Sequence, residues 1–307
     1  MAKVLTSALG NRWLLFASWI ALSCLLFKIP LTAFIRMSLS NDDTSYLVLI
    51  PFMSGWVLYV ERRKIFLNLS HDKVLAGILL LLAITAALAS RLAGGISVQG
   101  LDVSIIILSL LLAWVAGFAL LFGRVALTTG YFPLLFLLLM VPLPNLFLDR
   151  VIYLLQEGSA WTTGALFDLA GVPALRDGLV FHLARINIEV AKECSGIRSS
   201  MALLILALLV AHFYITSFWK KVLFLCCGLL MMVLKNGIRI STLTLLAIYV
   251  DPGFLHGKLH HQGGVIFFLF SLLLLAPLLW LLQRGEAIPK HDLPLPVLPS
   301  ESDLPSA

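Results

Sequence analysis

Long apolar runs separated by short polar breaks follow one another along most of the chain. A helix needs about 20 apolar residues to cross the hydrocarbon core of a membrane, and the runs of suitable length predict about eight spanning helices. They are expected at Trp13 to Ile35, Thr44 to Val60, Lys73 to Ser90, Val103 to Phe122, Val125 to Val141, Gly196 to Phe213, Phe218 to Leu234 and Gly264 to Leu282. An even number of spans places both ends of the chain on the same side of the membrane.

The longest stretch between these runs covers residues 143–193. The prolines of segment 142–144 should end the helix before it, because proline removes a backbone donor and clashes with the preceding turn. Leu146 to Leu169 carries apolar residues at helical spacing with charged residues between them, which predicts a helix lying in the membrane interface. Arg185 to Val190 alternates polar and apolar residues as a half-exposed strand does, so a short hairpin is expected before Cys194.

The composition agrees with a membrane protein, because 60% of the residues are hydrophobic and 12% are charged, with a mean hydropathy of +1.00. These values are typical of an all-α polytopic protein. The net charge of +6 is interpreted as loop topology and not as a nucleic-acid surface. Basic residues collect in short loops that are therefore predicted to be cytoplasmic, together with Lys3 and Arg12, at Arg62, Arg63, Lys64, Arg124, Lys220, Lys221 and Arg284. About half of the 22 Lys and Arg residues, among them Arg36 and Arg91, fall on the external side in this topology.

This orientation also divides the chain. Residues 1–284 are predicted to form a single transmembrane domain, with residues 143–193 as its extracytoplasmic insert. The remaining segment 285–307 is rich in proline, and such a composition cannot pack a core. It is predicted to be a disordered cytoplasmic tail.

Three polar groups interrupt the otherwise apolar sequence: Cys194 with Arg198, Lys235 to Arg239, and His256 to His261. On the predicted topology the sixth span starts, the seventh ends and the eighth starts on the external side. The three groups should therefore meet at one membrane depth. Charged residues in spanning segments cost about 2.5 to 3.5 kcal/mol each on insertion scales, so they persist mainly where they line a polar site.

The chemistry of these groups suggests acyl transfer. Cys194 begins a helix if Gly196 provides the turn, and free N–H groups, the helix dipole and a nearby arginine would then favour its thiolate. A thiol nucleophile needs a proton acceptor, and a developing oxyanion needs donors. His260 or His261 could act as base and later as acid, while Arg239 could hold the oxyanion.

Each of these residues also has a structural interpretation. Cysteine in an apolar helix is usually a packing residue, and Arg239 could extend to lipid head groups. The histidines could form a metal site or a protonation-sensitive loop, but no zinc-ligand spacing is completed nearby, so no metal and no cofactor is expected. A transporter or scaffold with a polar path and a metal-dependent intramembrane hydrolase are the alternative classes.

The same residues closely resemble the motifs of the exosortase/archaeosortase family of membrane cysteine transpeptidases. The resemblance covers the chain from about Asp42 to Phe268. It rests on Glu193-Cys194-Ser195-Gly196-Ile197-Arg198-Ser199, on Asn236-Gly237-Ile238-Arg239-Ile240, and on His260 followed four residues later by Gly264 and then by aromatic residues.

This resemblance implies a protease and transpeptidase that acts on exported proteins at the periplasmic face of the bacterial inner membrane. Members cleave a C-terminal sorting signal, which consists of a short motif such as Pro-Glu-Pro, a membrane helix and a basic tail. They transfer the new C-terminus to an acceptor, which is unknown here and either a lipid or exopolysaccharide-related. Carried over, Cys194 is the nucleophile, Arg239 the transition-state stabiliser and His260 the general acid/base. The supporting residues are Ser195, Gly196, Arg198 and Asn236.

Two positions depart from the family pattern. His261 lies next to His260 and competes with it for the catalytic role. Thr44-Ser45-Tyr46 stands where many exosortases carry Ser-His-Gly. The subfamily and the substrate motif therefore stay open.

Overall fold

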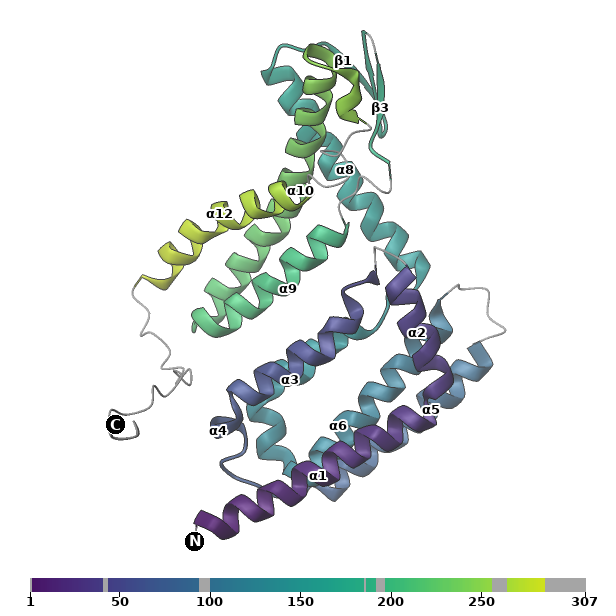
Figure 1. Ribbon diagram of the computed structural model, residues 1–307, viewed down its shortest axis with the longest axis vertical. Coiled ribbons are helices and arrows are strands. Elements are labelled where there is room, and N and C mark those ends of the chain that lie inside the picture. Colours follow the sequence, from purple (N-terminus) through teal and green to yellow (C-terminus); the bar gives the residue numbers. More distant parts are fainter. Residues whose placement is uncertain are drawn as a thin grey trace, which may run out of the picture.

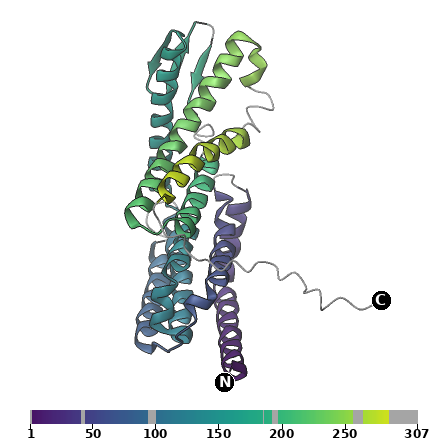
Figure 2. The ribbon, with the colours of Figure 1, turned by 90° about the vertical axis from the view of Figure 1, so that its left-hand side faces the viewer.

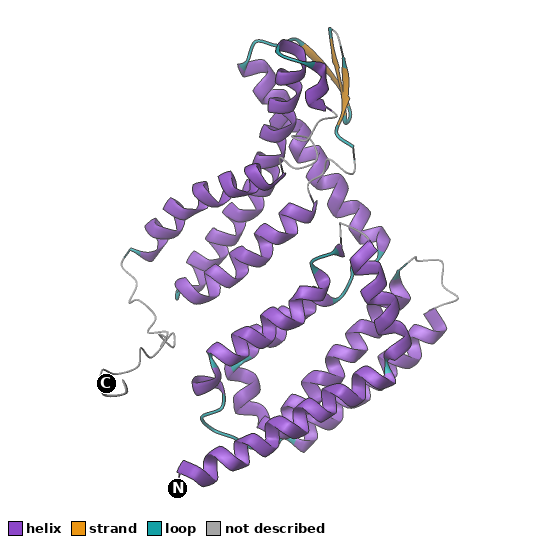
Figure 3. Ribbon diagram, viewed as in Figure 1, coloured by secondary structure: helices purple, strands orange, loops and turns teal. Residues whose placement is uncertain are grey.

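The computed structural model describes residues 2–40, 44–93, 100–184, 186–191, 197–255 and 264–284, and helices dominate these residues (Figure 3). The helices are α1 (Ala2–Leu26), α2 (Lys28–Ser40), α3 (Ile50–Val60), α4 (Arg62–Ile65), α5 (Lys73–Ala93), α6 (Leu101–Thr129), α7 (Tyr131–Phe136), α8 (Asn145–Leu169), α9 (Ile197–Tyr214), α10 (Phe218–Tyr249) and α12 (Gly264–Gln283). Short 3-10 helices occur at η2 (Leu47–Leu49), η3 (Leu137–Met140) and η5 (Pro252–Leu255). The proline-rich segment predicted to be disordered, 285–307, lies outside the described residues.

Several of these helices are suited to a membrane. Within the described residues four helices are long and apolar enough to cross one, namely α5, α6, α10 and α12. The number rises to six if each of two bent pairs is one span, and shorter apolar helices lie at Leu47–Val60 and Ser199–Tyr214. A multi-pass, nearly all-α membrane protein is therefore confirmed. The count of eight spans stays a prediction.

The helices form two groups that are joined by the long helix α8 (Figure 1). In the first group, α1, α3, α4 and α6 surround an aromatic core that includes Phe118 and Phe122. In the second group, α9, α10 and α12 pack on one another around Leu203, Phe224 and Met232. Figure 2 shows the same two groups from the side, and α9 of the second group lies alongside α3 of the first, because Ile205 shares a cluster with Ile50 and Phe213 contacts Trp56.

Helix α6 breaks at Gly123, whose φ of 84° favours glycine, and a short helical part then continues to Thr129. The break falls between the predicted spans Val103 to Phe122 and Val125 to Val141, and their number stays a prediction. The last four carbonyls before Gly123 accept hydrogen bonds from another part of the chain. The backbone N–H of Asp72 donates to Ala119 O (3.3 Å), and that of Ser70 donates to Phe122 O (3.3 Å). The side chains of His71 and Arg12 donate from Nδ1 to Leu120 O (2.7 Å) and from Nη1 to Leu121 O (2.9 Å). These bonds satisfy carbonyls that a broken helix would otherwise leave unpaired in an apolar environment.

The first predicted span, Trp13 to Ile35, is not one straight helix. It is divided between α1 and α2, which are bent by 85° at Phe27. The break lies beside Lys28 and Pro30, and proline is favoured near the start of a helix and not in its interior. The chain therefore turns where the sequence becomes less apolar.

Helix α10 extends far beyond the predicted span Phe218 to Leu234, since it continues to Tyr249. At 1.5 Å per residue its length is about 48 Å, compared with about 30 Å for a bilayer core. The predicted span stops before Lys235 because the apolar run ends there, but the helix continues because it packs along α8. Figure 1 shows α8 and the upper part of α10 side by side.

A three-stranded antiparallel sheet lies at this end of α8 and α10 (Figure 3). Its strands are β1 (Ala174–Asp177), β2 (Val180–Leu183) and β3 (Asn187–Glu189), in the order β1-β2-β3. The hairpin expected before Cys194 is therefore present, and β1 adds a strand that was not predicted. Phe181 packs edge-on against Phe167 of α8, and both are buried, so the sheet is fixed to the helix.

The contact with α10 bears on the prediction that Leu146 to Leu169 lies in the membrane interface. The second part of α8 faces α10 and the sheet, whereas its first part exposes Phe147, Val151 and Leu154. Exposed apolar residues suit a membrane boundary. The interfacial position of α8 stays a prediction.

Candidate active site at the start of helix α9

The predicted site residues are divided between described and undescribed parts of the chain. Asn236 and Arg239 lie on α10. The backbone of Arg198 belongs to the first turn of α9, but its side chain is outside the described part. The remaining predicted residues lie outside the described residues altogether, namely Cys194, Ser195, Gly196, His260 and His261. The described residues that flank these segments outline the surroundings of the site.

The chain just before the cysteine segment is fixed to α8. Gln156 on α8 donates a hydrogen bond from Nε2 to Val190 O at 2.6 Å. The Val190 N–H donates to Leu179 O at 2.9 Å, which continues the sheet by one residue beyond β3. The Val190 side chain is fully buried in a cluster with Phe181 and with Ile240 of α10. The entry to the cysteine segment is thus held between α8, α10 and the sheet.

The chain just after the cysteine segment is fixed to α10. Lys235 Nζ donates a hydrogen bond to Ser199 Oγ, which lies in the first turn of α9. Lys235 is only 3% exposed, and the adjacent Ser200 is 1% exposed. A buried ammonium group is expensive unless polar atoms surround it, so this contact fixes the start of α9 against the middle of α10.

Close packing brings α8 and α10 together beside the site. Asn236 Nδ2 donates to Ser159 Oγ at 3.0 Å, and Thr163 Oγ1 donates to Gly237 O at 3.4 Å. A Cβ atom on Gly237 would lie 2.4 Å from Cβ of Thr162, so the two backbones approach as closely as only glycine allows. Small residues and interhelical hydrogen bonds are the usual means of packing helices in membranes.

Arg239 follows Lys235 by four residues on α10, and side chains at this spacing lie on the same helix face. Arg239 is half-buried, and the next residue, Ile240, belongs to the cluster that holds Val190. Lys235 and Arg239 thus lie on one face of α10, and Lys235 contacts the chain just after the cysteine segment. Such a face favours an anionic group or a developing oxyanion.

The histidine segment is bracketed by described elements. On one side η5 folds back on the end of α10, where the Asp251 N–H donates to Leu246 O at 3.0 Å. On the other side α12 begins at Gly264 and packs against α9 and α10. The two elements that flank segment 256–263, η5 and α12, therefore both pack against α10, which also contacts both flanks of the cysteine segment.

Sequence reasoning gave no role to four residues that hold the site together: Gln156, Ser159, Thr163 and Lys235. Three of them lie on α8 at spacings of three and four residues, which is a polar stripe at helical periodicity. Such a polar stripe in the sequence indicates a buried polar contact between helices. Lys235 had been placed in a polar group, but a helix position alone does not identify Ser199 as its partner.

The described residues contain no group of three or more His, Cys, Asp or Glu side chains that could hold a metal ion. The histidines that the sequence singled out for such a site, His256 to His261, are not among them. The side chains available around the start of α9 are hydrogen-bond donors and cations.

Comparison with known proteins assigns the chain to a family. The model of the transmembrane exosortase family matches residues 38–277, which is well over half of the chain and includes every predicted site residue. Neither the comparison with curated proteins nor that with solved structures gave a match. On the extent of the family match, the chain belongs to the transmembrane exosortase family.

Proposed function

We propose that this protein is a membrane cysteine protease and transpeptidase with Cys194 as its nucleophile. The observation that carries the proposal is the attachment of both flanks of the cysteine segment to the α8–α10 pair. Gln156 holds Val190 before the segment and Lys235 holds Ser199 after it. Helix α10, which contacts both of these described flanks, also carries Arg239.

The proposed reaction is acyl transfer through a thioester. The Cys194 thiolate attacks the scissile carbonyl and forms a carbon–sulfur bond, while Arg239 stabilises the negative charge on the carbonyl oxygen. The carbon–nitrogen bond then breaks, and His260 gives its proton to the departing amine. An acceptor nucleophile attacks the thioester, loses its proton to the histidine and releases the thiolate.

The proposed substrates are exported proteins with a C-terminal sorting signal of a short motif, a membrane helix and a basic tail. Such a signal would place its cleavage site at the membrane surface, the level at which the three polar groups are predicted to meet. The proposed location is the bacterial inner membrane with the site on the periplasmic face. The acceptor would be a lipid or an exopolysaccharide-related molecule.

A processing assay with single substitutions tests this proposal. In cells that express a reporter with such a sorting signal, Cys194→Ala should abolish cleavage, whereas Cys226→Ala in the apolar part of α10 should not change it. Of His260→Ala and His261→Ala, only the substitution of the catalytic histidine should abolish cleavage. Normal processing by Cys194→Ala would rule out the proposed nucleophile.

The orientation can be tested separately. Asp177 lies on β1 at the end of the molecule formed by α8, α10 and the sheet, and it is exposed. In a chain otherwise free of cysteine, Asp177→Cys should react with a membrane-impermeant maleimide added to the periplasmic side. Labelling that requires disruption of the inner membrane would contradict the proposed orientation.

A further inference from the structure

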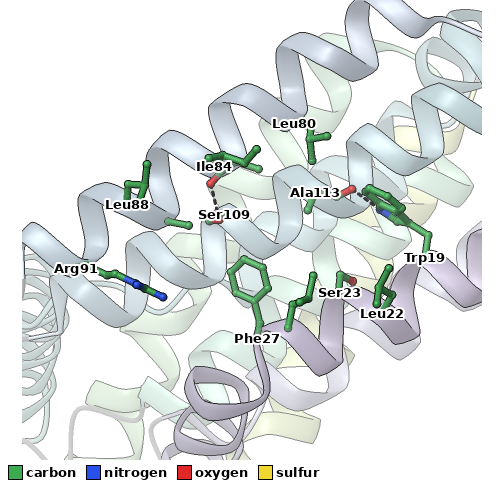
Figure 4. A pocket seen from close by; sticks show the side chains of 13 residues that line it. Trp19, Leu22, Ser23, Phe27, Leu80, Ile84, Leu88, Arg91, Ser109 and Ala113 are labelled. Atoms are coloured by element: carbon green, nitrogen blue, oxygen red, sulfur yellow. Dashed lines mark hydrogen bonds between the residues drawn. The ribbon is translucent and has the colours of Figure 1, made fainter.

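A groove of about 380 Å³ lies far from the cysteine segment, between α1 and α5 (Figure 4). Both helices pack against α6, which supplies part of the floor. The floor residues Ala83, Ser109 and Ala113 are buried, whereas the edge residues Leu22 and Leu88 are more than half exposed. The groove therefore opens outward between predicted membrane helices, on the side where lipid chains would lie.

The polar atoms of the groove wall are already paired within the protein. Trp19 Nε1 donates to Ala113 O at 2.8 Å, and Ser109 Oγ donates to Ala83 O at 2.7 Å. Ser23 Oγ donates to Ile20 O at 2.7 Å. The wall consequently presents carbon to the groove, and such a surface favours an apolar occupant.

Arg91 is the one charged side chain among the residues that line the groove within the described part of the chain. It lies in the last turn of α5 and is exposed, and it makes no hydrogen bond or ion pair to another described residue. Figure 4 shows its side chain extending from α5 across the end of the groove on the side of Phe27. The groove thus combines an apolar wall with a single cation at one end.

The dimensions fit a lipid chain. From Leu80 to Arg91 the groove follows α5 over about 16 Å, at 1.5 Å per residue. This length is about half of the 30 Å hydrocarbon core, which is the depth of one leaflet. An acyl chain that lies along the wall would therefore place its head group at the level of Arg91.

We propose that this groove binds one acyl chain of an anionic phospholipid and that Arg91 pairs with the lipid phosphate. Guanidinium groups bind phosphate oxygens through two parallel hydrogen bonds, which gives the contact both strength and orientation. The site is independent of the cysteine chemistry, because it uses the opposite group of helices. A lipid bound there would link α1 to α5.

The alternative is that Arg91 only extends to whatever head groups surround the protein, as arginines near helix ends commonly do. Arg36 on α2 provides the matched control. It is exposed and predicted to lie on the same side of the membrane, but it does not line the groove. A specific site requires Arg91 and not Arg36.

Native mass spectrometry can measure the binding with defined probes. The full chain, stripped of lipid in a neutral detergent, is titrated with phosphatidylglycerol and with phosphatidylcholine of identical chains. The wild-type protein should bind phosphatidylglycerol about fivefold more tightly, as expected for one basic residue near an anionic lipid. Arg91→Gln should remove this preference, and Arg36→Gln should retain it.

Two further measurements separate the chain from the head group. Ala87→Phe fills the groove and should weaken binding of both lipids, with thermal melting used to confirm that the variant is folded. Glycerol 3-phosphate, which has a phosphate but no chains, should not displace phosphatidylglycerol. Retained preference in Arg91→Gln, an equal loss in Arg36→Gln, unchanged binding to folded Ala87→Phe, or displacement by glycerol 3-phosphate would each overturn the proposal.

Discussion

Lys235 is a buried cation in a membrane helix, and its position connects the two chain segments on which the proposed chemistry depends. Its ammonium group contacts Ser199 at the start of α9, while its own helix carries Arg239 one turn further on. Removing the ammonium group frees the start of α9 without altering either proposed reacting group. Lys235 is therefore a positioning residue in this account.

Lys235→Met should lower the rate of substrate processing by about 10- to 100-fold, because a hydrogen bond to a charged group contributes about 1.5 to 3 kcal/mol. Met retains most of the side-chain volume and removes the cost of burying a charge, which offsets the lost hydrogen bond, so thermal stability in detergent should fall little. Lys28→Met, at an exposed position on α2, is the control and should be neutral. Adding Ser199→Ala to Lys235→Met should cause little further loss, since both changes remove one contact. Fully additive losses would show that the two side chains act separately.

At the scale of single residues the sequence indicated candidate site residues but not the contacts that hold them. Asn236 and Arg239 were predicted from polar side chains in an apolar run, and both lie on the helix that contacts the flanks of the cysteine segment. The partner of Lys235 could not be predicted, because Ser199 lies on another helix and its pairing depends on how the two helices pack.

The contact between α8 and α10 is the element on which the site is built. Gly237 allows the approach of Thr162, and Gly158 similarly lies where an added Cβ would be 2.8 Å from Val233. Neither glycine has a positive φ, so the requirement comes from space and not from backbone conformation. The close approach places Ser159 within reach of Asn236.

Gly237→Ala should therefore destabilise the protein by about 1 to 3 kcal/mol, the usual cost of overfilling a packed interface. The expected result is a lower melting temperature in detergent and reduced processing. Gly77→Ala on α5 is the matched control, since a Cβ there has no atom within 4 Å. An unchanged melting temperature in Gly237→Ala would contradict the close contact between α8 and α10.

The elements that were predicted least well are those in which hydropathy and packing disagree. The apolar pattern ends at Leu234, but α10 continues because α8 provides a polar partner beyond the apolar run. Strand β1 was missed because it exposes Leu175 and turns Arg176 inward, where Arg176 pairs with Glu157 at 2.7 Å. Hydropathy assigns these two side chains to the wrong faces.

At the scale of the whole molecule, the two groups of helices are linked through α9. Glu61 Oε1 at the end of α3 lies 3.2 Å from His212 Nε2 near the end of α9, and both side chains are nearly buried. The His212 ring stacks on Phe132 with centroids 3.7 Å apart. Trp56 of α3 meets Phe213 edge-on at 5.5 Å. A polar contact surrounded by aromatic rings thus joins the first group to the second.

A double-mutant cycle can measure this link. Glu61→Gln and His212→Phe, alone and together, should reveal a coupling free energy of about 0.5 to 3 kcal/mol in reversible unfolding by detergent. The pair Glu157 and Arg176 is the control, because both side chains are partly exposed and should couple by less than about 1 kcal/mol. Additive effects of Glu61→Gln and His212→Phe would show that the contact does not join the two groups.

Hydropathy alone predicted that the molecule is a membrane protein, because apolar runs of this length are typical of membrane-spanning helices. The arrangement into two groups did not, since Glu61 and His212 are distant in the sequence and follow no shared pattern. Bent pairs such as α1 with α2 also limit any count of spans, because a run of apolar residues does not reveal whether its helix is straight.

The proposed reaction requires Cys194 to form a thioester with the processed substrate, and intact-protein mass spectrometry can detect this adduct. The purified wild-type chain, mixed with a reporter that ends in a sorting signal and quenched in acid, should gain the mass of the shortened reporter. Hydroxylamine should remove this mass, and Cys194→Ala should never acquire it. Processing of the reporter without any adduct on the wild-type chain, or an adduct that persists in Cys194→Ala, would contradict the claim.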